Sequence, residues 1–156
     1  MFTVKKLKNL DVCGIFKVAQ ILQKCGKDMA HKSDLHHWDN LYLKTLAIVA
    51  YGSLKNDVYL VLSDNKPIAT FQIRKVGPSV IFQKLATLPD YSGKGIGTFC
   101  LSEIEKIAKN SSSNKIICEV YDKSENAISF YLKRGFKVCG EKETLKYKEL
   151  KMEKEL

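Results

Sequence analysis

Three glycines alternate with other residues at positions 93, 95 and 97, directly after an apolar run and directly before an amphipathic one. A glycine inside a regular element is unfavourable by roughly 0.5–1 kcal/mol relative to alanine, so the presence of three glycines here requires a physical explanation. N–H groups at the start of a helix have no partner within the helix, and the helix dipole favours negative charge there. Glycines let the backbone approach a phosphate closely, and Lys94 adds a positive charge. The pattern predicts an anion site, with a plain tight turn as the alternative.

Two familiar phosphate motifs do not match this loop. A Walker loop requires Lys-Ser or Lys-Thr directly after its last glycine, whereas here Gly97 is followed by Thr98 and Phe99. A dinucleotide fingerprint requires G-x-G-x-x-G in an early strand–helix–strand unit, whereas this chain has G-x-G-x-G after an apparent meander. The loop therefore favours neither Mg-nucleotide hydrolysis nor NAD or FAD binding.

The elements that must position the loop follow from the spacing of apolar residues and from turn chemistry. Three strands before the loop are expected to form an antiparallel meander. Gly26 is expected to end the first helix and residues 27–39 to form a loop, while Gly135 is expected to close the last helix in a left-handed conformation. The predicted strands cover residues 2–7, 58–62, 68–75, 79–87, 115–121, 137–140 and 147–152, and the predicted helices cover residues 10–24, 41–51, 97–109 and 122–134.

Composition bounds the class of protein. The chain has 156 residues, 45% of them hydrophobic and 28% charged, which suits one domain spanning residues 1–156 with a substantial core. No apolar run is long enough to cross a membrane and no signal-peptide centre is evident, so a cytoplasmic protein without a membrane partner is expected. Five widely spaced cysteines without a CxxC predict buried, reduced thiols rather than a disulfide framework or a zinc site.

The formal charge of +9 allows two interpretations. A basic chain can bind nucleic acid or accept a polyphosphate ligand. Alternatively, the lysines simply cover a solvated surface. Basic residues are scattered among acidic ones, as in KYKELKMEKEL, and are not interleaved with aromatic residues. The sequence therefore favours the second interpretation, and a nucleic-acid partner is not expected.

Two segments together resemble the GNAT superfamily of acetyl-CoA-dependent N-acyltransferases. In LATLPDYSGKGIGTFCLSEIEK, the frame from Ser92 to Gly97 matches the family's pyrophosphate loop, with serine in place of the usual Gln or Arg. In ICEVYDKSENAISFYLKRGFKVCGE, a strand precedes a helix that carries Tyr131 and then Gly135-Phe136. The resemblance implies an α/β fold (α+β, with a mixed sheet), in which helices flank a central, mostly antiparallel sheet.

The resemblance also implies where acetyl-CoA would bind. The strand before the loop would pair its free backbone groups with the pantetheine arm, and the N–H groups of the loop would hold the pyrophosphate. Ser124 stands where the family often has Asn and can still cap the helix. Tyr131 would lie near the sulfur and protonate the departing thiolate, with a purely structural core aromatic as the alternative. The implied cofactor-binding residues are Leu85, Ala86, Thr87, Ser92, Gly93, Lys94, Gly95, Ile96, Gly97, Thr98, Ser124, Asn126 and Tyr131.

The acceptor, by the same resemblance, would bind between the first two helices, their connecting loop and the late strands. His37 and Trp38 in that loop are the candidate substrate-binding residues, together with Gln83 on the strand before the glycines. Trp38 could offer an aromatic wall to an amine, or it could pack while the histidines face water. No metal is predicted, because the histidine pair lacks further ligands at useful spacing.

Direct attack requires a neutral amine, and amines are mostly protonated at pH 7. The strand of residues 79–87 contains no carboxylate, and Glu119 on the next strand is the candidate base, with a structural strand residue or proton removal by water as alternatives. The resemblance therefore implies an N-acetyltransferase that passes the acetyl group of acetyl-CoA to a primary amine of a small molecule or peptide. The alternative is a CoA-binding sensor or interaction module without turnover. The resemblance is compatible with a homodimer.

Overall fold

One seven-stranded sheet organises the computed structural model, which describes residues 1–8 and 11–156. The strands lie in the order β1-β2-β3-β4-β5-β7-β6, and every neighbouring pair is antiparallel except β4 with β5. The mixed α/β class, the mostly antiparallel sheet and the meander of β2, β3 and β4 are confirmed. The elements are β1 (Phe2–Lys6), α1 (Val12–Ser33), α2 (Tyr42–Ser53), β2 (Asp57–Ser63), β3 (Lys66–Val76), β4 (Ser79–Thr87), α3 (Ile96–Asn110), β5 (Lys115–Tyr121), α4 (Glu125–Leu132), β6 (Lys137–Glu143) and β7 (Lys148–Glu155).

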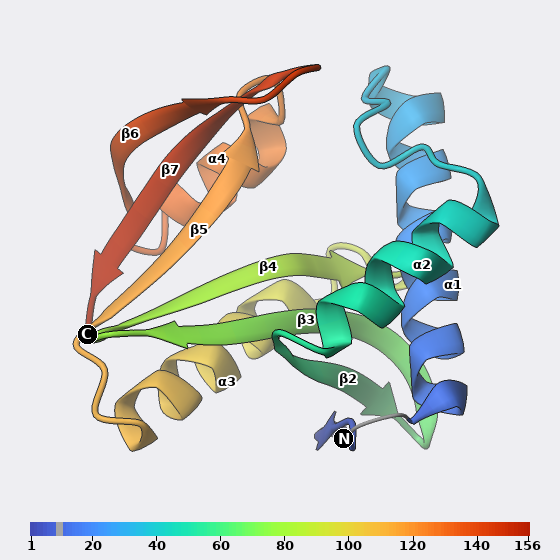
Figure 1. Ribbon diagram of the computed structural model, residues 1–156, viewed down its shortest axis with the longest axis horizontal. Coiled ribbons are helices and arrows are strands. Elements are labelled where there is room, and N and C mark those ends of the chain that lie inside the picture. Colours follow the sequence, from blue (N-terminus) through green and yellow to red (C-terminus); the bar gives the residue numbers. More distant parts are fainter. Residues whose placement is uncertain (9–10) are drawn as a thin grey trace.

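The two central strands diverge along their length. β4 and β5 pair only through residues 79–81 and 115–117, although β4 runs on to Thr87 and β5 to Tyr121. Figure 1 shows the two strands meeting near the C-terminus and opening away from it. Because no described strand pairs with β4 on this side after residue 81, part of its backbone edge is available to a ligand.

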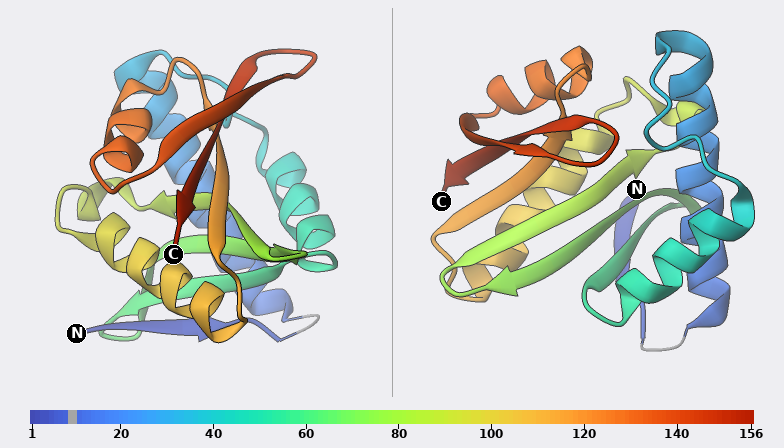
Figure 2. Two further views of the ribbon diagram at one scale, coloured as in Figure 1. Left: turned by 90° about the vertical axis from the view of Figure 1, so that its left-hand side faces the viewer. Right: turned by 45° about the horizontal axis from the view of Figure 1, so that its top comes forward.

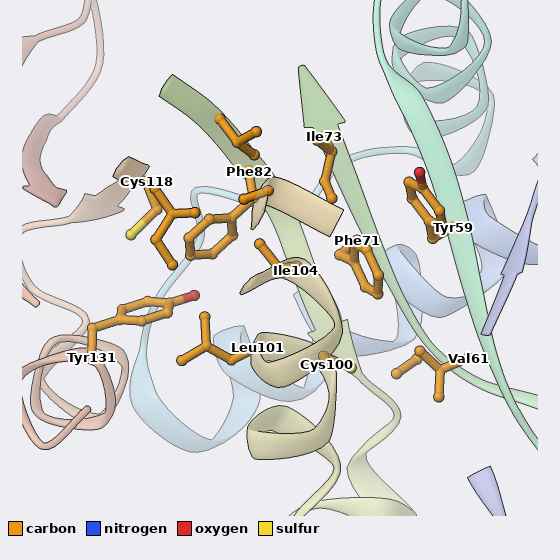
Figure 3. Close-up of a cluster of buried hydrophobic side chains, with 14 of the residues drawn as sticks. Tyr59, Val61, Phe71, Ile73, Phe82, Cys100, Leu101, Ile104, Cys118 and Tyr131 are labelled. Carbon is orange, nitrogen blue, oxygen red and sulfur yellow. The ribbon is translucent and has the colours of Figure 1, made fainter. Parts of the chain in front are cut away.

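The sheet separates two groups of helices (Figure 2), and a cluster of buried apolar residues lies on each side of it. On one face, residues of α3 and α4 pack with residues of β3, β4 and β5, as Figure 3 shows for Phe71, Phe82 and Ile104. On the other face, α1 and α2 contribute Val18 and Val49 to a second cluster. β4 contributes Val80 and Phe82 to the first cluster and Ala86 to the second, so it is packed on both faces.

The first helix is longer than predicted. Its predicted first residue, Leu10, lies outside the described residues, and α1 begins at Val12, where the Asp11 side chain accepts a hydrogen bond of 2.8 Å from the N–H of Gly14. The helix then continues through Gly26 to Ser33, so the prediction that Gly26 ends it is wrong. A Cβ on Gly26 would lie 2.3 Å from the carbonyl oxygen of Trp38. This glycine therefore serves the close approach of the following loop to the helix.

Most other boundaries agree with the prediction to within a few residues, and α4 is shorter than predicted. Gly135 has φ of +85°, and the N–H of Phe136 reaches back to the carbonyl of Tyr131 at 3.2 Å, which confirms the left-handed closure. In the described part of the chain, no helix has both the length and the apolar character that crossing a bilayer requires.

The cysteines are all free, as predicted, but only three of them are buried. Cys25, Cys100 and Cys118 lie in the apolar clusters. Cys13 and Cys139 are exposed, contrary to the prediction. Cys13 lies in the first turn of α1, and Cys139 lies on β6, which is an edge strand of the sheet, so neither position is covered by a second layer.

Candidate active site

The glycine loop forms the N-terminal end of α3. Gly93 and Gly95 have φ of +75° and +79°, the left-handed region that glycine adopts without strain. A Cβ at either position would meet no atom within 4 Å, so these two glycines serve backbone conformation rather than packing. Gly97 differs, because its Cβ would lie 3.3 Å from the ring of Phe130 on α4. Gly93 and Gly95 thus allow the left-handed backbone conformation of the loop, and Gly97 allows the close contact between α3 and α4.

Six consecutive N–H groups of this loop are free. Within residues 1–8 and 11–156, no protein group accepts a hydrogen bond from the N–H of residues 93–98, and the first paired N–H is that of Phe99, which bonds to the Gly95 carbonyl at 3.0 Å. A hollow of about 340 Å³ lies against the loop and is also lined by Thr87 and Tyr91. Free N–H groups at the positive end of a helix dipole favour an anion in this hollow.

The free edge of β4 leads from this hollow toward the interior. The N–H of Leu88 bonds to the carbonyl of Ile68 on β3 at 2.8 Å. Because backbone groups alternate along a strand, those of Ala86 also face β3, whereas those of Leu85 and Thr87 face the free edge. The Thr87 carbonyl already accepts a hydrogen bond of 3.1 Å from the Cys25 thiol. Leu85 and Thr87 are the residues whose main chain can pair with an extended ligand.

A cleft of about 140 Å³ opens where β4 and β5 separate. It brings together the candidate acid, the candidate base, the helix-start serine and all three candidate acceptor residues. Asn126 is exposed on α4 and is not among the residues that line the cleft. The predicted residues at the cleft are His37, Trp38, Gln83, Leu85, Glu119, Ser124 and Tyr131.

Tyr131 forms the inner wall of the cleft and is 8% exposed. Its ring packs 5.7 Å from Phe82 and 5.3 Å from Phe136. Figure 3 shows its hydroxyl pointing away from α4 toward Phe82 and Leu101. Burial, with a smaller effect from the nearby thiols, raises the pKa of Tyr131 well above its usual value. The hydroxyl therefore keeps its proton at neutral pH.

Glu119 lies on the opposite face of the sheet from Tyr131. Its neighbours Cys118 and Val120 are buried with Tyr131, so the alternation of β5 directs Glu119 to the other side. Its carboxylate pairs with Lys142 at 2.9 Å. A second carboxylate, Glu149 on β7, also lines the cleft, and burial followed by the charge of Glu119 raises the pKa of Glu149. A group bound in the cleft would have a hydroxyl on one side and carboxylates on the other.

The loop after α1 covers the same cleft. The ring of His37 lies 4.5 Å from that of Tyr121 on β5 and 5.8 Å from that of Trp38. Its Nδ1 is buried and has no hydrogen-bond partner among the described residues. Burial lowers the pKa of His37, so the imidazole is neutral at pH 7. His37 is thus placed in the site, whereas exposed His36 pairs with Asp34 at 2.8 Å outside it.

The sequence profile of the acetyltransferase (GNAT) family matches residues 18–136, which include the glycine loop, the diverging strands and α4. The chain belongs to the GNAT acetyltransferase family. No curated protein sequence matches this chain.

Solved structures support the fold of this GNAT protein. PaiA N-acetyltransferase from Thermoplasma acidophilum, in complex with coenzyme A, superposes with a TM-score of 0.76 at 20% identity, covering 100% of this chain and 99% of that one. The ribosomal-protein-S18-alanine N-acetyltransferase of Escherichia coli gives 0.75 at 18% identity, covering 99% and 94%. A GNAT family acetyltransferase from Elizabethkingia anophelis with acetyl-CoA bound gives 0.74 at 13% identity, covering 99% and 98%. At such identities the likeness establishes the fold.

Arg134 lines the hollow beside the glycine loop of this GNAT protein, although sequence reasoning does not single it out. Its guanidinium stacks 3.7 Å over the Phe130 ring and donates hydrogen bonds to the Phe130 carbonyl at 3.0 Å and to the Thr98 hydroxyl at 2.5 Å. Its Nε is buried without a partner among the described residues. The one available signal in the sequence is its position directly before Gly135. Arg134 adds a positive charge beside the free N–H groups of the loop.

Lys84 is a second residue of the GNAT cleft that the sequence conceals. The register between β3 and β4 shifts between the Thr70 and Gln72 pairs, and Lys84 takes φ of +51° at this bulge. Phe82 and Leu85 consequently pack in the same cluster although they are three residues apart. Strand alternation alone would place Lys84 with Phe82 in the core. Instead Lys84 lies on the α1–α2 side, where burial lowers its pKa.

Two details of the GNAT site qualify the sequence predictions. Ser124 precedes α4 as its N-cap residue and is buried at the cleft, but its side chain makes no cap hydrogen bond, so the expected serine cap is wrong. Burial raises the pKa of Cys100 to about 12 and raises that of Cys118 still further. Both thiols are therefore protonated at neutral pH and poorly suited to act as nucleophiles.

Proposed function

We infer that this protein transfers the acetyl group of acetyl-CoA to a primary amine. The observation that carries the inference is the set of six N–H groups at residues 93–98 without acceptors among the described residues, beside a hollow that Arg134 also lines. This arrangement suits a diphosphate, because each free N–H can donate to a phosphate oxygen and the guanidinium adds charge. Membership of the GNAT family makes coenzyme A the diphosphate ligand to test first.

Acetyl-CoA would lie along the route that the free backbone groups mark. The diphosphate would bind at the loop, and the pantetheine arm would pair with Leu85 and Thr87 on the free edge of β4. The thioester would then reach the cleft between β4 and β5, because this edge continues directly into it. We propose that residues 1–156 act as one such catalytic domain.

The two sides of the cleft suit direct transfer. Glu119, directly or through water, would accept the proton that the acceptor ammonium must lose. The amine nitrogen would then form a bond to the acetyl carbon while the carbon–sulfur bond breaks, and Tyr131 would give its proton to the leaving thiolate. The second proton of the nitrogen would pass, through water, to the tyrosinate and restore the Tyr131 hydroxyl. The products are the N-acetylated amine and coenzyme A. Because the thiols of Cys100 and Cys118 are buried and protonated, the proposal includes no covalent enzyme intermediate.

Two measurements on the purified chain test this function. Calorimetry should detect coenzyme A and acetyl-CoA binding, and a thiol reagent should detect coenzyme A release with at least one member of a panel of amines, polyamines, amino acids and peptides. Binding without release from any acceptor would favour a sensor without turnover. The absence of both binding and release would refute the proposed function.

A further inference from the structure

A second cavity, of about 170 Å³, adjoins the catalytic cleft on the α1–α2 side of the sheet. We call it the Lys84 pocket, and Lys84, Thr45, Trp38, His37 and Tyr147 are among its lining residues. It shares Lys84, His37 and Trp38 with the cleft, so a small molecule can extend from one into the other. Through His37 and Tyr147 it also adjoins a wider outer hollow of about 490 Å³, which gives access from solvent.

The ammonium of Lys84 lacks an acidic partner in this pocket. No carboxylate in residues 1–8 and 11–156 forms an ion pair with it, and it donates a long hydrogen bond of 3.5 Å to the side-chain oxygen of Gln72. Gly52 of α2 lies beside this contact, and a Cβ there would lie 3.1 Å from the Gln72 side-chain oxygen and 3.5 Å from Nζ. Lys84 is half-buried, and a desolvated cation without an ion-pair partner is stabilised by a ligand that supplies negative charge.

The polar groups around Lys84 leave an excess of hydrogen-bond donors. The Gln72 oxygen accepts from Lys84 and also from the Asn56 amide at 3.3 Å, which fixes the orientation of the Gln72 amide. Among the described residues, the Gln72 Nε2 group then has no acceptor although it is fully buried. Thr45 lines the pocket and is 6% exposed, and its hydroxyl has no partner in the part of the chain that the structure describes. Buried polar groups are rarely left unpaired, so the Thr45 hydroxyl beside Lys84 points to a ligand in the pocket that brings acceptor oxygens.

The opposite charge lies across the cleft. Glu119 and Glu149 line its β5–β7 side, whereas Lys84 lies on its β4 side. A molecule with an ammonium group at one end and an anionic group at the other would match both. The small volumes of the pocket and the cleft suit a compact molecule of this kind.

We propose that the Lys84 pocket binds the carboxylate of the acetyl acceptor, and that the acceptor is a small amino carboxylic acid. Lys84 pairs with the carboxylate and Thr45 donates to it, while the amine lies in the cleft between Glu119 and Tyr131. The carboxylate takes no part in the bond changes and leaves with the N-acetylated product. The proposal rests on the proposed function for the amine end of the molecule.

The test compares each acid with its own amide. The twenty α-amino acids and the ω-amino acids from β-alanine to 6-aminohexanoate are assayed with acetyl-CoA beside their carboxamides, using the wild type, Lys84→Met and Lys84→Arg. At least one acid should be acetylated with kcat/KM ten-fold or more above its amide. Lys84→Met should remove most of this preference, and Lys84→Arg should retain part of it. Lys66→Met, at an exposed turn outside the pocket, is the matched control for loss of one positive charge.

A second variant separates recognition from folding. Thr45→Val keeps the shape of the side chain and removes an unpartnered buried hydroxyl. It should therefore raise the thermal midpoint of the unliganded protein and lower kcat/KM for the preferred acid several-fold. A merely structural Thr45 would change stability without changing the acid-to-amide ratio.

The outcomes distinguish this proposal from the proposed function. Amides used as well as acids, or a preference that Lys84→Met leaves intact, would overturn the carboxylate site while leaving the acetyl transfer in place. If no compound is acetylated, thermal shifts with the same acids decide: a shift that Lys84→Met abolishes supports the site although the transfer has failed. The absence of any such shift would overturn the site as well.

Discussion

Replacing Tyr131 with phenylalanine tests the chemistry most directly, because it removes one oxygen and keeps the ring. The ring contacts with Phe82 and Phe136 are retained, so the free energy of unfolding should change by no more than about 1 kcal/mol. A positioned general acid typically contributes a factor of about 10²–10⁴ to the rate. Tyr131 is 8% exposed, which leaves little room for water to replace it as the proton donor. We therefore expect kcat to fall about 10³-fold, or roughly 4 kcal/mol in the barrier.

The assay follows coenzyme A release at saturating acceptor, with calorimetry for acetyl-CoA affinity. Affinity should stay within about three-fold of the wild type, because the proposed diphosphate contacts lie on α3 and Arg134. Tyr59→Phe is the matched control: Tyr59 is a buried tyrosine of the same cluster, stacked 4.9 Å from Phe71 and well separated from Tyr131 in Figure 3. If Tyr131→Phe keeps kcat within about three-fold of the wild type, as Tyr59→Phe should, the hydroxyl is not the acid and Tyr131 is a packing residue.

Three other predictions concern the diphosphate site, the helix contact and the covering loop. Arg134→Gln should weaken coenzyme A binding at least ten-fold in calorimetry, since a charge-assisted hydrogen bond contributes about 1.5–3 kcal/mol. Lys133→Gln, at the exposed neighbouring position, should have little effect on this affinity. Gly26→Ala should destabilise the fold by about 3 kcal/mol or more in denaturant unfolding, because its Cβ would lie 2.3 Å from the carbonyl oxygen of Trp38. Gly93→Ala, which has open space but a positive φ, should destabilise it by only about 1 kcal/mol. Equal effects of the two variants would contradict the close contact at Gly26. Burial lowers the pKa of His37 below its unfolded value near 6.5. The contribution of neutral His37 to stability is therefore complete above that pH and is lost as the pH falls through the folded pKa. In thermal scans from pH 5 to 8, the midpoint of His37→Gln should fall less steeply on the acid side than that of the wild type.

Much of the candidate site could be predicted because its signals are local. The left-handed glycines, the free N–H groups and the helix that follows them all belong to one short segment, and short-range geometry determines each of them. The expectation that Gly26 ends α1 failed for the converse reason. A glycine has the same local signature whether it ends a helix or admits a distant carbonyl, and here Trp38 supplies the contact.

The sequence by itself determined the glycine-rich start of α3 and the order of the elements, because periodicity and turn chemistry act over a few residues. The residues expected at the inner cleft came from the resemblance to the GNAT family. Only the tertiary structure decided that β4 leaves β5 after three residues, that Arg134 joins the loop, and that a bulge turns Lys84 out of the core. A bulge shifts every side chain after it relative to the alternation of the strand, and it arises from pairing with a neighbouring strand. The position of Lys84 therefore depends on how β3 and β4 are paired, which the residues around Lys84 do not specify by themselves.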